Sequence, residues 1–409
     1  MTPRSQTAQT AIILGGGPTG CFTALTLANI GYTTTIYEIR PEPAVTVGGG
    51  VNLSPNCIRI LQKIGLADKI IAAGWKCDRI VMRNARGQTL GIAEDGVESK
   101  YGYPMVMIRR MRFLRILLDA VKEKGIPIHY SKKATSISET SSDVTVTFED
   151  TTTATASILL GCDGIHSFTR THHVAPQISE TYTGVAASFQ FLNKSTMDPL
   201  PSLPGDVTGH FGAEGFVGMV RSAPEEIFWM VNSQQPLKSR EGWKEDHPTA
   251  VRDKLLAKFG HWASPVPEVI NAATEEMYWY PIHKLDITSD PTYTWHTPRT
   301  LLLGDAAHAM PPHAGQGTAM GFEDAVMLGR VLEKYPAWEY EDVFQKVYEV
   351  RVPRVREVLA TAEKRGGERR EVYWWVAYLR EWVVWAFLSL KDKKALDPVV
   401  QYDVYKVDV

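Results

Sequence analysis

The first forty residues alternate between apolar runs and a glycine-rich turn. Residues 11–14 form a short apolar run, residues 15–20 contain four glycines, and residues 21–30 are mostly apolar and lead to Gly31. Residues 33–37 are rich in β-branched side chains and precede Glu38. This pattern predicts a strand, a tight turn, a helix with a glycine stop and a second strand. Such a βαβ unit belongs to a parallel sheet.

The rest of the chain predicts an α/β protein with an inserted β-rich domain. Apolar spacing predicts helices at residues 55–64 and 110–124, and strands at 80–82, 128–130, 144–148 and 156–160. From about residue 182 to 279 the pattern changes to strands at 184–192, 207–211, 216–220 and 227–231, with a helix near 251–259. A core strand at 300–303 and a helix at 317–333 follow. The first domain therefore resumes after the insertion, which predicts four segments: 1–175, 176–290, 291–340 and a helical C-terminal region, 341–409.

Composition and charge exclude several classes of protein. The chain is 44% hydrophobic and 22% charged, with a formal net charge of −2, values typical of globular proteins. Because the net charge gives no positive electrostatic potential to attract a phosphate backbone, we do not expect nucleic acid as a partner. The four cysteines form no Cys-x-x-Cys pair, so we expect neither a disulfide framework nor a metal site. We expect the thiols to be reduced and the protein to be cytoplasmic. The first nine residues lack the apolar core of a secretion signal, so we expect the mature protein to start here.

Residues 371–391 are unusually aromatic and contain Trp374, Trp375, Trp382 and Trp385. A membrane span needs about 20 apolar residues. Charged residues at the centre, Arg380 and Glu381, oppose insertion. We therefore expect an amphipathic helix that packs on the protein or lies on a surface, not a transmembrane span, which leaves weak membrane association through this helix open.

The turn Gly15-x-Gly17-Pro18-Thr19-Gly20 matches a Rossmann-like dinucleotide-binding motif. The first glycine permits the turn, Gly17 lets a pyrophosphate approach the backbone, and Gly20 lets helix and strand pack closely. Glu38 follows the second strand, where a carboxylate binds ribose hydroxyls and disfavours a 2′-phosphate. Arg40 could meet such a phosphate, so this loop alone does not identify the dinucleotide.

Two more motifs follow predicted strands, Gly161-Cys162-Asp163-Gly164 and Leu303-Gly304-Asp305-Ala306-Ala307-His308-Ala309-Met310-Pro311. With the first motif, in this order and spacing, they make the chain resemble the FAD-dependent aromatic hydroxylases. These are the group A flavoprotein monooxygenases typified by para-hydroxybenzoate hydroxylase and salicylate hydroxylase-like enzymes. The resemblance covers residues 11 to about 330. The aromatic C-terminal segment and Tyr402-Asp403-Val404 more weakly resemble fungal members from secondary metabolism.

The resemblance implies tightly bound FAD, NADPH or NADH as a transient reductant, and O2 as co-substrate. Glu38 would bind the adenosine ribose, Asp163 the FAD and NAD(P)H region, and Asp305 the ribityl and pyrophosphate region. Arg110 would contact the flavin, with Arg109 as the alternative. The loop Gly48-Gly49-Gly50-Val51-Asn52-Leu53, called the flavin loop below, would pack beside the isoalloxazine ring. The implied set of cofactor-binding residues is Gly15, Gly17, Pro18, Thr19, Gly20, Glu38, Arg40, Gly49, Gly50, Val51, Arg110, Asp163, Gly304, Asp305, Pro311, Gly315, Gly317 and Thr318.

Two features near the third motif bear on the flavin. A helix that starts at Gly315-Gln316-Gly317-Thr318 would point free N–H groups at the pyrimidine edge of the ring, where negative charge appears on reduction. Pro311 would line the face where oxygen reacts. In the family that the chain resembles, the motif histidine, here His308, is mostly a structural part of the loop.

The substrate domain is less informative. Some relatives carry His-x-x-x-Tyr above the flavin, whereas here Glu214 follows His210. A catalytic base is therefore not assigned, and His210, His283 and Pro311 are the candidates for contact with the reacting groups. No arginine occurs at 183–192, where some relatives hold a carboxylate, which disfavours a simple benzoate. About half of a set of apolar residues should line a cavity for an aromatic or polyketide-like molecule. Phe211, Met219, Trp229, Met230 and Tyr280 are the chosen candidates, with Phe216 and Trp279 also considered.

We expect an FAD-dependent monooxygenase in which a C4a-hydroperoxyflavin passes oxygen to an electron-rich substrate. The outcome, whether hydroxylation, epoxidation or Baeyer-Villiger insertion, stays open. Two alternatives remain: an FAD-dependent dehydrogenase or oxidase without oxygen insertion, and a flavin-bound cyclase or binding scaffold that performs no redox chemistry. The patterns do not distinguish a monomer from a homodimer.

Overall fold

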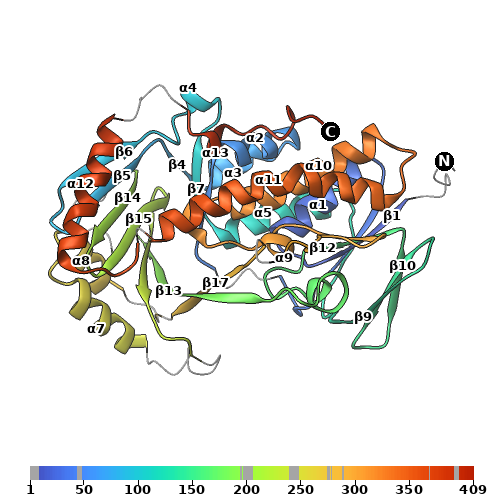
Figure 1. The fold of residues 1–409 in the computed structure, drawn as a ribbon, viewed down its shortest axis with the longest axis horizontal. Helices are drawn as coiled ribbons and strands as arrows, with labels where there is room; N and C mark the ends of the chain where they lie inside the picture. Colours follow the sequence, from blue (N-terminus) through green and yellow to red (C-terminus); the bar gives the residue numbers. More distant parts are fainter. Residues whose placement is uncertain are drawn as a thin grey trace.

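The computed structural model describes residues 9–43, 48–193, 196, 206–238, 248–273, 277, 279–287, 290–367, 369–390 and 396–409. A five-stranded parallel sheet in the order β18-β12-β1-β2-β8 forms its first domain. Its strands are β1 (Thr10–Leu14), β2 (Thr33–Tyr37), β8 (Ile128–His129), β12 (Ile158–Gly161) and β18 (Thr300–Leu302). The predicted βαβ unit is confirmed, since α1 (Pro18–Asn29) joins β1 to β2 (Figure 1). The domain is discontinuous, because β18 follows the insertion and pairs with β12.

The two faces of this sheet are covered differently. On one face, Ile13 and Ile36 pack in the largest core with α1, α5 (Arg110–Glu123) and α10 (Gly317–Lys334). On the other face, Ile12 and Leu14 pack against an antiparallel meander of β9 (Ala134–Glu139), β10 (Val144–Phe148) and β11 (Thr153–Ala156). Because both faces are buried, the central strands β1 and β12 are short, nearly continuous apolar runs.

A seven-stranded sheet in the order β17-β13-β16-β15-β14-β5-β6 forms the second domain. Its strands are β5 (Ile80–Asn84), β6 (Thr89–Ala93), β13 (Glu180–Asn193), β14 (Val207–Gly212), β15 (Gly215–Ala223), β16 (Glu226–Gln234) and β17 (Tyr280–Leu285). Helices α7 (Pro248–Phe259) and α8 (Val266–Asn271) pack on one face. The sheet takes two strands from before residue 176, because β5 pairs in parallel with β14, so it does not follow the predicted boundary there.

A small sheet and several helices connect the two domains. Strands β3 (Gly50–Leu53), β7 (Met105–Arg109) and β4 (Trp75–Cys77) form the small sheet, which packs against the second face of the seven-stranded sheet. The remaining elements are α2 (Pro55–Lys63), α3 (Ala67–Ala73), α4 (Glu98–Tyr101), η1 (Arg170–Val174), α9 (Asp305–His308), η2 (Pro312–Ala314), α11 (Tyr340–Gly367), α12 (Trp374–Leu390) and α13 (Pro398–Gln401). Within the described ranges, no helix is long and apolar enough to cross a membrane.

A buried cluster of charged residues joins α10 to α11. The Arg351 guanidinium donates to the Glu323 carboxylate at 2.7 Å and to the Asp324 carboxylate at 2.8 Å, and all three side chains are fully buried. Asp324 also accepts from the Gly304 N–H at 2.9 Å and contacts His308 Nε2 at 2.7 Å. Burial raises the pKa of Asp324, but the positive charges and hydrogen bonds of His308 and Arg351 outweigh it and lower the pKa to about 2.

We predict that Arg351→Met lowers the free energy of unfolding by about 3–5 kcal/mol, because it leaves two buried carboxylates without their cation. The control is Lys69→Met, which removes the exposed Lys69–Glu123 pair and should cost no more than about 1 kcal/mol. Urea unfolding of both variants measures the difference, and equal losses would contradict the prediction. The stabilisation due to the Asp324 carboxylate should be complete above its ordinary pKa of about 4 and decline as the pH falls toward 2.

Candidate active site

The glycine-rich turn has the geometry that a closely approaching ligand requires. Gly15 has φ +108°, and an added Cβ would lie 2.3 Å from the Cys162 carbonyl oxygen. At Gly20 an added Cβ would lie 1.9 Å from the Gly15 carbonyl oxygen, so helix and strand pack there without space for a side chain. Gly17, by contrast, has no atom within 4 Å of its Cβ position. No side chain caps α1 and its first turn has no acid, so its N-terminus is available to an anion.

Thr19 and Glu38 link this turn to its surroundings. Thr19 lies against Gly304 and Gly321, where an added Cβ would come within 2.9 Å and 2.5 Å of its hydroxyl, so the first and third motifs are in contact. The Glu38 carboxylate is buried and accepts from the backbone N–H of Gly16 at 2.7 Å and of Arg40 at 2.9 Å. The Arg40 side chain is exposed beside it. Each carboxylate oxygen keeps a further lone pair for a ribose hydroxyl.

Arg110 and Asp305 face the same space. In the segment 301–309 only Asp305 is exposed, so it lies at an opening in an otherwise buried region. Desolvation raises the pKa of Asp305, and the charges of His308 and Arg110 oppose this rise. Desolvation lowers the pKa of Arg110, and the negative charge of Asp305 opposes this fall. The Arg110 N–H also donates to the Gly49 carbonyl at 3.0 Å, which joins this pair to the predicted flavin loop.

Arg109, the alternative flavin contact, points elsewhere. Its guanidinium pairs with Glu226 at 2.8 Å and stacks 3.8 Å from the Phe191 ring centroid. Both partners belong to the seven-stranded sheet. The geometry therefore favours Arg110 as the arginine at the cofactor site.

Asp163 is engaged within its own loop. Its half-buried carboxylate accepts from the Ser167 hydroxyl, and from the Thr169 N–H and hydroxyl, both at 2.9 Å. The neighbouring Arg170 is fully buried and donates to the Ala306 carbonyl at 2.9 Å. The second motif thus holds the third in position, and a direct contact of Asp163 with the cofactor stays a prediction.

The N-terminus of α10 is open, while the residues beside it are held by hydrogen bonds. Gln316 donates to Ser54 at 2.9 Å and accepts from Asn56 at 3.0 Å. No side chain caps α10, its first turn contains no acid, and Gly317 has no atom within 4 Å of its Cβ position. Thr318 is partly exposed beside it. This open end agrees with the predicted place for the flavin pyrimidine edge.

Three other residues in or next to the third motif, Gly304, His308 and Pro311, are buried. Gly304 has φ +60° and lies beside Thr19. His308 is buried and bonded to Asp324, as expected for a structural residue. Pro311 is buried, whereas Pro312 is exposed. Pro312 is therefore more accessible than the predicted Pro311, whose contact with the flavin stays a prediction.

Asn52 supplies a test of whether a flavin fits. The Cβ position of Gly315 lies 3.4 Å from Asn52 Nδ2, so β3 and the start of α10 are neighbours. Asn52 Oδ1 is buried and has no hydrogen-bond partner within the described ranges. The pyrimidine edge of a flavin offers an N–H donor, and a buried acceptor needs such a partner. The open glycines, Asn52 and the uncapped helix fit the cofactor.

The seven-stranded sheet separates the predicted pocket residues onto two faces. In register, His210 pairs with Val217 and Met219 pairs with Trp229. These side chains share the face covered by α7 and α8, where Met219 and Trp229 are core residues. His210, Met219 and Trp229 therefore lie on the face away from the flavin loop, and their predicted contact with substrate has no support from this geometry. His210 is buried without a partner for its ring in the described structure, and desolvation, then Arg83, lowers its pKa to about 4.

The opposite face carries Met230, Tyr280 and Phe211 and is directed toward the flavin loop. Residues that the sequence analysis missed, Phe189 and Phe228, belong to it: their rings lie 3.4 Å and 3.5 Å from the Cβ position of Gly49. Phe189 stacks on Tyr280 with ring centroids 4.7 Å apart. Side chains alternate between the two faces along a strand such as β13, and this alternation was the available signal for Phe189.

His283 lies beside the second motif and not at this face. Its ring centroid is 6.3 Å from that of His166 and 5.5 Å from that of Tyr182. His313, which the sequence analysis did not single out, is buried next to the start of α10, and desolvation, then Arg369 and Arg370, lowers its pKa to about 3. Its place in Pro311-Pro312-His313 beside the third motif was the only signal.

Arg369, also missed, reaches the site from the C-terminal region. Its guanidinium lies 4.3 Å from the Phe216 ring centroid and 3.3 Å from His313 Nδ1. Phe216 pairs in register with Asn232, whose side-chain amide is fully buried and has no hydrogen-bond partner in the described structure. A cation and a buried amide thus lie on the face that carries Met230.

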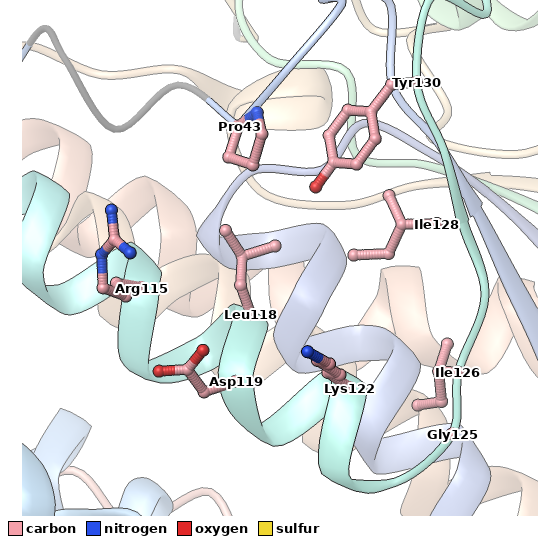
Figure 2. A pocket seen from close by; sticks show the side chains of 9 residues that line it. All are labelled: Pro43, Arg115, Leu118, Asp119, Lys122, Gly125, Ile126, Ile128 and Tyr130. Atoms are coloured by element: carbon pink, nitrogen blue, oxygen red, sulfur yellow. The ribbon is translucent and has the colours of Figure 1, made fainter.

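A groove of about 480 Å³ lies elsewhere on the first domain. Figure 2 shows Arg115, Leu118, Asp119 and Lys122 of α5 on one side of it and Pro43, Ile128 and Tyr130 on the other. None of the predicted site residues lines it. The groove lies next to the adenosine end of the site, because its residues Ile128 and Tyr130 flank His129, whose carbonyl accepts from the Glu38 N–H at 2.8 Å.

These features define a dinucleotide-binding protein with an aromatic-lined space beside its third motif. The model of the family described as "FAD binding domain" matches residues 8–362. The chain is 31% identical over 90% of both chains to the 3-amino-4-hydroxybenzoate 2-monooxygenase PtmB3 of Streptomyces platensis. It is 28% identical to the 6-hydroxynicotinate 3-monooxygenase of Bordetella bronchiseptica, over 85% of this chain and 88% of that one.

A solved structure has the same fold. Klebsiella pneumoniae HpxO complexed with FAD and uric acid aligns with a TM-score of 0.80 at 22% identity, over 92% of this chain and 93% of that one. The chain belongs to the FAD-binding flavoprotein monooxygenase family. It is an FAD-dependent monooxygenase, and its family uses NAD(P)H and O2. The predicted family, fold class and cofactor are confirmed, and a fungal origin stays a prediction.

We predict that Gly17→Ala folds normally but binds FAD at least about tenfold more weakly, a loss of about 1.4 kcal/mol. Gly17 has φ −78° and an added methyl group meets no protein atom, so only the approach of the pyrophosphate is blocked. Titration of the apoprotein with FAD measures the affinity. Gly367→Ala, at another open glycine, is the control. An unchanged affinity in Gly17→Ala would show that the cofactor does not approach this turn.

Proposed function

We propose that the protein hydroxylates an electron-rich aromatic small molecule with NAD(P)H and O2. The observation that carries the proposal is the meeting of three surfaces: the Gly49–Gly50 loop, the open N-terminus of α10, and the aromatic face with Phe189 and Phe228. A planar ring held beside the loop would have this face opposite it. Bound FAD supplies oxygen activation, while the chain holds the cofactor, excludes water and orients the substrate.

The proposed FAD site follows the chain from ribose to ring. Glu38 takes the adenosine ribose, and the N-terminus of α1 at Gly17 takes the pyrophosphate. Arg110 and Asp305 lie along the path toward the ring. At the pyrimidine edge, Asn52 accepts the ring N–H, and the positive end of α10 stabilises the negative charge that reduction places there.

For the substrate we propose an aromatic molecule with an acidic or strongly accepting group. The names of two relatives give 3-amino-4-hydroxybenzoate and 6-hydroxynicotinate as their substrates, both aromatic acids. Here Arg369 offers a cation near Phe216, although β13 lacks an arginine at 183–192. Since arginine only donates, His313 Nδ1 accepts from Arg369, which orients the guanidinium. Larger polyketide-like acids also meet this description.

The remaining expectations belong to the same proposal. NADPH and NADH are both kept as reductants, and monomer and homodimer as assembly states. Hydroxylation is preferred over epoxidation and Baeyer-Villiger insertion because both named relatives are aromatic monooxygenases. A cytoplasmic location stays a prediction from the sequence.

Anaerobic stopped-flow absorbance tests the function. The protein is mixed with NADPH or NADH and a panel of phenols and aromatic acids that includes 3-amino-4-hydroxybenzoate and 6-hydroxynicotinate, and then with oxygenated buffer. One compound should accelerate flavin bleaching, and heavy-isotope oxygen gas should label its product. Reduction without label would favour a dehydrogenase or oxidase, and ligand binding without any reduction would favour a non-redox scaffold.

We predict that Met230→Ala and Met219→Ala have opposite signatures. Met230 lies on the face toward the flavin, so its truncation should raise KM for the accelerating compound with little loss of stability. Met219 is 1% exposed on the other face, so its truncation should cost about 2–5 kcal/mol of stability and leave KM unchanged. Steady-state kinetics and thermal unfolding of both variants check this. The reverse pattern would contradict the assignment of the two faces.

We predict that Arg369→Met weakens the binding of aromatic acids about tenfold or more, since a charge-assisted hydrogen bond contributes about 1.5–3 kcal/mol. The probe is 3-amino-4-hydroxybenzoate, followed by perturbation of the flavin absorbance, with its carboxamide analogue for comparison. Arg370→Met is the matched control, because Arg370 is an exposed neighbour that donates to the Thr183 carbonyl. Equal losses for acid and carboxamide would count against an ionic contact.

A further inference from the structure

The helix α12 has its charged residues on the inside. Its inner side, with Ala377, Val384 and Leu388, packs over β6 and β14. The two charged residues of the helix lie on this side as well. Arg380 donates to the Gly212 carbonyl at 2.7 Å, and the Glu381 carboxylate pairs with Arg86 and accepts from Asn84 at 3.0 Å.

The outward side of α12 is apolar and aromatic. Every exposed residue between Trp374 and Leu390 is uncharged, and the group includes all four tryptophans, Tyr378 and Phe387. Trp374 is 77% exposed and Leu390 is 84% exposed. Figure 1 shows α12 at one end of the molecule, on the outer side of β5, β6 and β14. A contiguous apolar surface of this kind marks an interaction site.

The chemistry of this surface fits a lipid headgroup layer better than a membrane interior or a dry protein interface. With 17 residues, α12 is about 26 Å long, and it does not qualify as a span. Each indole N–H must find a hydrogen-bond partner when water is removed, and the headgroup layer supplies carbonyls and water to all of them at once. Tryptophan and tyrosine concentrate in that layer for this reason.

Charge along the chain favours an anionic membrane. Arg370 is exposed shortly before α12. Directly after Leu390 the sequence reads Lys391-Asp392-Lys393-Lys394, outside the described residues. Basic residues at the ends of an interfacial helix attract anionic headgroups. We propose that α12 lies flat on an anionic lipid bilayer, with its tryptophan face in the headgroup layer and the rest of the protein on the aqueous side.

This inference extends the proposed function, but its test gives a result whether or not the proposed function is correct. The inner side of α12 contacts Gly212 and Phe211, and the Phe211 ring lies 5.0 Å from that of Phe216, which belongs to the proposed substrate site. Membrane docking would therefore hold the aromatic face of the sheet near the bilayer, where apolar aromatic compounds collect.

Flotation of the FAD-loaded full chain with vesicles tests the proposal. Wild type should float with phosphatidylcholine–phosphatidylserine vesicles, less with phosphatidylcholine alone, and its tryptophan fluorescence should be quenched by brominated phosphatidylcholine. Trp382→Glu should reduce vesicle binding about tenfold or more, because it places a charge in the headgroup–acyl boundary. The matched control Leu237→Glu, at a residue 67% exposed outside α12, should bind like wild type.

Three outcomes would overturn the proposal. The first is a wild-type protein that stays with the aqueous fraction. The second is an equal loss of binding in both variants. The third is a wild-type dimer, seen by light scattering, that Trp382→Glu converts to a monomer, because a second copy would then be the occupant. Flavin absorbance and oxygen labelling of each variant show separately whether the fold and the proposed activity are intact.

Discussion

The buried ion cluster around Arg351 is the constraint on which the active site depends. One guanidinium pairs with both Asp324 and Glu323, and each carboxylate holds a different part of the site. Asp324 holds the Gly304 N–H and His308 in the third motif, while Glu323 accepts from Asn56, which also donates to the Gln316 side chain beside the start of α10. Arg354, 3.6 Å from Glu323, balances the charge. Losing one member would leave charges that burial makes costly.

The parts of the molecule that follow from backbone geometry could be predicted from the sequence. A turn with φ +108° at Gly15, and an approach of 1.9 Å to an added Cβ at Gly20, admit only glycine. Such positions are visible in any single chain, because the requirement is local. The strand that precedes Glu38 could also be predicted, because its β-branched residues are a local signal. The parallel sheet and a dinucleotide-binding turn could therefore be predicted from the residues themselves, whereas the choice of FAD came from the resemblance to the family.

The faces of the seven-stranded sheet could not be predicted, because both are buried. Alternation along a strand identifies the inner face only when the outer face is polar. Along β14, His210 and Phe211 are neighbours on opposite faces. His210 is polar but buried, so its polarity does not mark a solvent-exposed face. The α7 and α8 helices, which follow in the chain, decide which face becomes core. The choice of Met219 and Trp229 as pocket residues lacked this information.

Arg369 and His313 illustrate a second limit, because chain separation hides contacts. They are 56 residues apart, and the long helix α11, which packs on η2, brings them together. The same segment then continues into α12, so one length of chain contributes a cation to the proposed substrate site and an aromatic face to the outer surface. If the cation holds the acidic end of a substrate, the apolar body of that substrate lies toward Phe211 and α12. The arrangement then favours a ligand that is itself amphipathic.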